Sequence, residues 1–75
     1  MHNFYELNRV RYLEMDIAIQ IGNRVKKRRE KLGLKLKDFK QYIPELSTTR
    51  LSNYEHGTRI LPIDIAIKLQ PILQV

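Results

Sequence analysis

Basic side chains gather in one part of the chain, where they could bind a polyanion. Nine lysines and arginines and two acidic residues lie between Arg24 and Lys40, so this stretch carries +7, whereas all other residues together carry −1. A basic block on an otherwise balanced chain is typical of a protein with a polyanionic partner. A solvated cationic helix face would show the same charges, so the block alone leaves both interpretations open.

Side chains suited to specific hydrogen bonding lie between Ser47 and Glu55. At 3.6 residues per turn, one side of a helix here would carry Leu51, Tyr54 and Glu55. The opposite side would be small and polar, with Thr48, Thr49, Arg50, Ser52 and Asn53. Arg50 stands in the first turn, where a cation opposes the helix dipole, and this placement favours an anion facing it. A solvated helix with threonine and serine left over from capping is the alternative.

Glycine and proline divide the chain into short segments of helical composition. Asp16 is a candidate N-cap for a first helix over 16–32, which Gly33 would end in the left-handed conformation. A second short helix is expected over 36–43, because Pro44 disfavours its continuation. With their connector, these two helices would carry the basic block.

Two further helices are expected toward the end of the chain. Ser47 is a good N-cap for a third helix that runs to about Glu55. A fourth helix begins at Pro62 and is expected to end near Leu69 or Gln70, because Pro71 would remove a helical hydrogen bond. The isoleucines of this last segment alternate, so its pattern also fits a strand.

Two charged residues stand where a helix disfavours them. Arg29 follows Val25 by four residues and therefore points along the apolar stripe of the first helix. Glu55 lies at the C-terminal end of the third helix, where an anion opposes the dipole. We therefore predict that Arg29 and Glu55 form a structural ion pair that joins the first helix to the third.

Length and composition exclude several classes of protein. A chain of 75 residues without cysteine forms one domain and has no disulfide, zinc ribbon or thiol nucleophile. The two histidines are far apart in sequence, and no glycine-rich phosphate loop or metal-ligand spacing occurs, so we expect no enzyme activity, no cofactor and no metal site. The apolar runs are too short to cross a membrane and the first residues lack a signal-peptide layout, so we expect a cytoplasmic protein.

The segments 22–34 (GNRVKKRREKLGL) and 51–59 (LSNYEHGTR) together resemble the Cro and lambda-repressor-like helix-turn-helix family, also called the Xre family. The matching motif residues are Arg29, Gly33, Ser52, Glu55 and Gly57. The resemblance covers about residues 17–73. It implies an all-α, compact four- to five-helix domain over 16–75. Residues 1–15 lie outside the resemblance, and their own pattern predicts an extra N-terminal helical segment. The arginine–glutamate bridge of the family matches the predicted ion pair.

The resemblance also implies that the chain binds double-stranded DNA, with the third helix in the major groove. The expected base contacts are Thr48, Thr49, Arg50 and Asn53. An asparagine can bond adenine, an arginine can bond guanine, and threonine methyls can meet the thymine methyl. The expected phosphate contacts are Lys35, Lys37, Ser52, Thr58 and Arg59. The chain departs from the family pattern at Leu36, where glutamine is usual, at Lys40, where a small residue is usual, and at Pro44-Glu45, where one glycine is common.

The expected role is that of a transcriptional regulator, and by family analogy a repressor. One such module buries only roughly 600–1,000 Å², so we expect a homodimer on paired half-sites. Its interface could be 71–75 or the extension 1–15, where an apolar stripe is expected from Phe4, Leu7, Val10 and Leu13. The extension could instead cover the domain's own core, or translation could start at Met15. An antitoxin or adaptor that mainly binds a partner protein is the alternative function.

Overall fold

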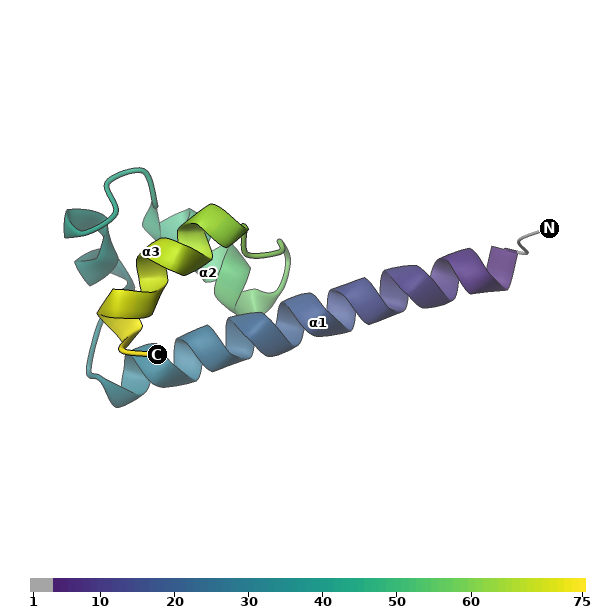
Figure 1. Cartoon of the computed structure of the whole chain (residues 1–75), viewed down its shortest axis with the longest axis horizontal. Helices are drawn as coiled ribbons and strands as arrows, with labels where there is room; N and C mark the ends of the chain where they lie inside the picture. The colour runs from purple at the N-terminus through teal and green to yellow at the C-terminus, as the bar shows by residue number, and fades with distance from the viewer. Residues whose placement is uncertain (1–3) are drawn as a thin grey trace.

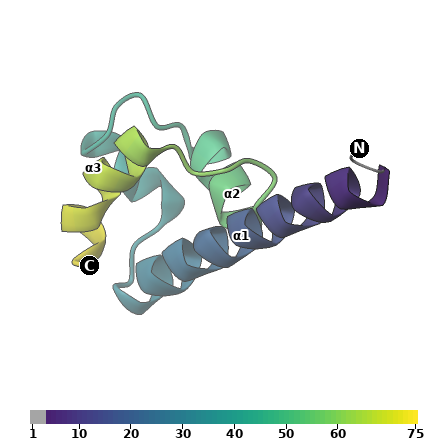
Figure 2. The same ribbon diagram turned by 45° about the vertical axis from the view of Figure 1, so that its right-hand side comes forward.

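The computed structural model describes the backbone from residue 4 to residue 75 and the side chains from residue 16 onward. In this part of the chain there are three α-helices, α1 (Phe4–Lys31), α2 (Thr48–His56) and α3 (Ile63–Leu73), one 3-10 helix, η1 (Leu36–Gln41), and no strand. The three shorter helices lie on one side of α1, close to its C-terminal half (Figures 1 and 2). The predicted compact, all-α fold of four to five helices is confirmed, with four helices.

Helix α1 is one continuous helix of 28 residues, so the prediction that Asp16 caps a separate first helix is wrong. No glycine or proline interrupts the chain before Gly22, and Ala18 and Glu14 near this point are good helix formers, so nothing forces a break. The N-terminal half of α1 extends past the other helices in both views (Figures 1 and 2).

The apolar stripe expected from Phe4, Leu7, Val10 and Leu13 falls on side chains outside the part of the chain that the structure describes, so it stays a prediction.

The loop that follows α1 and the loop that follows α2 each turn at a glycine in the left-handed region. Gly33 has φ 73° and Gly57 has φ 75°. After Gly57, the Thr58 amide donates to the Asn53 carbonyl at 3.1 Å, and the Leu34 amide donates to the Arg29 carbonyl at 3.0 Å after Gly33. These bonds satisfy carbonyls at the helix ends and fix the direction in which the chain leaves.

The second helix is shorter and tighter than expected. An α-helix over 36–43 is predicted, and the structure has the 3-10 helix η1, which ends at Gln41. The Lys35 amide donates to Asp38 Oδ2 at 2.8 Å and closes its first turn. Phe39 and Ile43 are nevertheless both buried, because the chain beyond the helix turns Ile43 back into the core.

Helix α3 continues through Pro71, so the predicted end near Leu69 or Gln70 is wrong, and the strand alternative is wrong as well. Pro71 lies in the last turn, where it removes a single bond to the Ile67 carbonyl. Leu69 and Leu73 lie on the same side of the helix and are both buried, which holds the last turn in place.

One hydrophobic core joins all four helices. Its fully buried members are less than 2% exposed and come from η1, the loop that follows it, α2 and α3: Phe39, Ile43, Leu46, Leu51, Ile65 and Leu69. Val25 of α1 closes the core from the other side at 8% exposure. The core thus fixes α2 between α1 and η1 and leaves one side of α2 toward solvent.

Candidate nucleic-acid interface

Helix α2 begins and ends where the sequence predicts. Ser47 is extended at its N-cap position, and its hydroxyl accepts a hydrogen bond from the Arg50 amide at 3.1 Å. At the other end Gly57 takes the left-handed cap. Leu51, Tyr54 and Glu55 are buried, so the orientation of the helix about its own axis is set by these three side chains.

The side of α2 that faces away from the core carries the small polar residues. Thr48 and Thr49 are exposed, and Ser52 and Asn53 are half-buried. Three hydroxyls and one amide on an uncovered helix face can donate and accept hydrogen bonds at the edges of bases. The side chains predicted to contact bases are therefore accessible, with Arg50 as a separate case.

Arg50 is held by its own chain. Its Nη1 donates to the Glu45 carbonyl at 3.1 Å, and its Nη2 donates to the Tyr54 hydroxyl at 2.8 Å. The guanidinium carbon also lies 5.8 Å from the centre of the Tyr54 ring, a cation–π distance. Arg50 therefore joins the loop before α2 to the second turn of the helix, a role that its position alone did not indicate.

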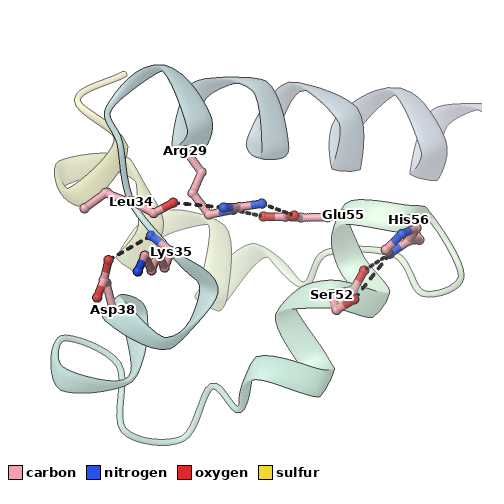
Figure 3. Close-up of polar contacts among 7 residues, drawn as sticks. All are labelled: Arg29, Leu34, Lys35, Asp38, Ser52, Glu55 and His56. Atoms are coloured by element: carbon pink, nitrogen blue, oxygen red, sulfur yellow. Dashed lines mark hydrogen bonds and ion pairs between the residues drawn. The ribbon is translucent and has the colours of Figure 1, made fainter.

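The end of α2 forms a small hydrogen-bonded unit with the loop after it. The Thr58 hydroxyl donates to the Asn53 carbonyl at 3.1 Å, so it keeps lone pairs to accept another bond. The His56 Nδ1 lies 2.7 Å from the Ser52 carbonyl and 3.3 Å from the Ser52 hydroxyl (Figure 3). Arg59 is exposed in the same loop.

The lysines expected to grip phosphate lie on a different element. Lys35 and Lys37 are exposed at the start of η1. The carboxylate of Asp38 binds the backbone amide of Lys35, as Figure 3 shows. Both lysines therefore lie at the start of η1, Lys35 as its N-cap and Lys37 in its first turn, while Ser52 lies in α2 and Thr58 and Arg59 lie in the loop beyond it.

Arg29 and Glu55 form a bidentate ion pair between α1 and α2 (Figure 3). Arg29 Nε donates to Glu55 Oε2 at 2.7 Å and Nη2 donates to Oε1 at 3.0 Å, while Nη1 donates to the Leu34 carbonyl at 2.9 Å. The Glu55 side chain is 2% exposed and that of Arg29 is 12% exposed. The hydrogen bond to Glu55 raises the pKa of Arg29 above its ordinary value, so the guanidinium stays charged. The pair joins α1, the loop after it and α2.

Gly22 is a structural residue that sequence reasoning missed. A Cβ on Gly22 would lie 2.1 Å from the Tyr54 carbonyl oxygen and 2.6 Å from that of Glu55. Helices α1 and α2 therefore cross with backbone against backbone at this glycine. The available signal is a glycine inside a predicted helix, where it costs stability unless packing requires it.

Two further polar contacts hold the C-terminal part of the domain. Arg28 Nε donates to the Leu73 carbonyl at 2.8 Å and caps the end of α3. The Lys68 ammonium pairs with the Glu45 carboxylate, and this bond lowers the pKa of Glu45 and raises that of Lys68. Through Glu45, whose carbonyl binds Arg50, the loop before α2 is tied to α3.

Comparison with known proteins gives one match. Residues 25–75, more than half of the chain, match the family model HTH_3, described as helix-turn-helix. No curated protein and no solved structure matched the chain. The matched region begins in the last two turns of α1 and contains η1, α2 and α3. Within the described part of the chain, no helix is long and apolar enough to cross a membrane.

Proposed function

The chain belongs to the helix-turn-helix family HTH_3, of the Cro/C1 and Xre type, which is a DNA-binding family, and from this premise we propose that it is a sequence-specific transcriptional repressor. In this proposal a homodimer acts in the cytoplasm, and each copy places α2 in the major groove of double-stranded DNA. The observation that carries the proposal is the side of α2 that faces away from the core, which is uncharged apart from Arg50, polar and uncovered.

Base recognition is assigned to Thr48, Thr49 and Asn53, with a conditional role for Arg50. The Asn53 amide can bond N6 and N7 of one adenine, and the threonine methyls suit the thymine methyl. Arg50 would reach a guanine only by leaving Tyr54 and the Glu45 carbonyl. We therefore assign it first to holding α2 in place, and to base contact only in the complex.

Phosphate contacts are assigned to residues on both sides of α2. The exposed cations Lys35, Lys37 and Arg59 would neutralise phosphates. Ser52 and Thr58 would supply hydroxyls near the end of the helix, where Thr58 still has acceptor lone pairs. These contacts fix the position of the protein on DNA and carry no sequence information themselves.

A second candidate function is binding of a partner protein, as in an antitoxin or adaptor of this fold. The N-terminal half of α1 supports it, because it extends beyond the other helices (Figure 1). Ile17 and Ile19, where this half begins to leave the domain, are about half exposed. Both roles can coexist, since α2 and the N-terminal half of α1 are separate surfaces.

Selection from a random duplex library tests the proposed function. We expect one enriched half-site sequence and an affinity that falls steeply with salt. Lys37→Ala should weaken binding to every duplex and reduce the salt slope by about one unit, while Lys27→Ala, an exposed lysine of α1, is the matched control. An affinity for duplex DNA that does not change with salt would contradict the proposal. A selected pool without an enriched sequence would contradict it as well.

A further inference from the structure

Helix α3 carries large apolar side chains on the side that faces away from the core. Ile63 is 79% exposed and Ile67, one turn later, is 60% exposed. Ile60, just before the helix, is 55% exposed. We call Ile60, Ile63 and Ile67 the isoleucine patch. Two exposed isoleucines one turn apart, with a third just before the helix, are typical of a surface that another molecule covers.

Packing in the domain's own core does not explain why the residues of the isoleucine patch are apolar. The buried side of α3 is formed by Ile65, Leu69 and Leu73, each no more than 4% exposed. Ile63 and Ile67 lie roughly opposite to it at 100° per residue. Helix α3 is therefore apolar on two sides, a pattern found in helices that are covered on both.

We propose that the isoleucine patch binds the same patch of a second copy of this chain, with the two α3 helices antiparallel about a two-fold axis. Asp64 and Lys68 are one turn apart and lie along one flank of the patch. In an antiparallel pair the same flanks face each other, so Asp64 of each copy would lie beside Lys68 of the other. The surface is thus complementary to itself in charge as well as in apolar character.

The charge distribution also favours a second copy at this place over other places on the surface. The chain carries +6, and most of the excess lies between Arg24 and Lys40, where two copies would repel each other. Helix α3 contains one acid and one base and is neutral. The Lys68 ammonium is already held at the flank by Glu45 of its own chain.

The patch and the proposed DNA-reading face can be used at the same time. Leu51 and Ile65 are buried in one core, so the outward sides of α2 and α3 face away from the same centre in different directions. The inference rests on the proposed function in one respect, namely that a repressor of this size needs a dimer to occupy two half-sites. It places the interface on α3, whereas the sequence suggested 1–15 or 71–75.

Analytical ultracentrifugation without DNA tests the interface. The wild-type chain should move with concentration from its 9.0 kDa monomer mass toward twice that mass. Ile67→Glu should raise the dimer dissociation constant by about 30-fold or more, the effect of losing a central apolar contact. Ile17→Glu is the matched control, an isoleucine of α1 that is 53% exposed, and should leave the dimer intact. Circular dichroism should show that both variants keep the helical fold.

A charge exchange tests the antiparallel arrangement. Asp64→Lys and Lys68→Asp should each be monomeric, because each variant brings like charges together across the axis. An equimolar mixture of the two variants should recover the dimer, since their flanks are then opposite in charge. A mixture that stays monomeric overturns the antiparallel pairing, and a wild-type monomer, or a dimer lost with Ile17→Glu but kept with Ile67→Glu, overturns the patch.

Binding to a single half-site separates this inference from the proposed function. The Ile67→Glu variant should bind a duplex with one half-site as tightly as the wild type and lose only the gain from a second half-site. If neither the wild type nor Ile67→Glu binds DNA, but the dimer is lost with Ile67→Glu and kept with Ile17→Glu, the proposed function fails and the interface stands.

Discussion

Replacing Gly22 with alanine gives a prediction whose sign depends on the crossing of α1 and α2. At an open helix position, Gly→Ala stabilises by about 0.5–1 kcal/mol, because alanine loses less backbone entropy. At Gly22 the new Cβ would lie 2.1 Å from the Tyr54 carbonyl oxygen, where 3.4 Å is ordinary contact. The obstructing atom is backbone, so the two helices themselves would have to separate by about 1 Å.

The expected net effect of Gly22→Ala is a loss of about 1–3 kcal/mol of unfolding free energy. Overpacking of this kind typically costs about 1–3 kcal/mol, and the movement would also stretch the Arg29–Glu55 pair, which bridges the same two helices. For a domain of this size each kcal/mol lowers the melting temperature by about 4–8 °C.

Urea and thermal unfolding followed by circular dichroism measure this effect. Asn23→Ala is the matched control, because Asn23 is exposed on the same helix and should gain a few tenths of a kcal/mol from helix propensity. If Gly22→Ala is as stable as the wild type or more stable, the backbone-to-backbone crossing of α1 and α2 is refuted.

Two further predictions concern the ion pairs. Glu55→Ala should cost about 3–5 kcal/mol in urea unfolding, because it leaves Arg29 largely buried without its partner, whereas Arg29→Met combined with Glu55→Leu should cost much less. An equal loss in the single and double variants would argue against this cause. The lowered pKa of Glu45 means that its pair with Lys68 contributes stability above the ordinary value of 4.5, and that this contribution is lost as the pH falls through the lowered pKa. The wild type should therefore lose more stability than Glu45→Gln in thermal melts as the pH falls below 4.5, and parallel curves would contradict it.

Local signals predict helix α2 well. Ser47 and Gly57 are caps whose effect depends on residues one turn away, so the bounds of α2 follow from the sequence. The pair of Arg29 and Glu55 can be inferred in the same way, because each charge is unfavourable in its own helix. These features need no knowledge of the remaining fold.

Features that depend on packing between distant segments could not be predicted. Asp16 has the chemistry of an N-cap, yet the helix continues through it because no stronger signal stops it. Pro71 is tolerated because the burial of Leu73 outweighs one lost bond. The role of Gly22 depends on a carbonyl that is more than thirty residues away in the chain.

One comparison tests most directly whether the side of α2 that faces away from the core reads bases. The base preferences of wild type and Asn53→Ala are measured on the same random duplex library at one salt concentration. We expect Asn53→Ala to lose about 1–3 kcal/mol on the preferred sequence and to lose preference at a single adenine position, with the other positions unchanged. An unchanged preference at every position would contradict the assignment of α2 as the helix that reads bases.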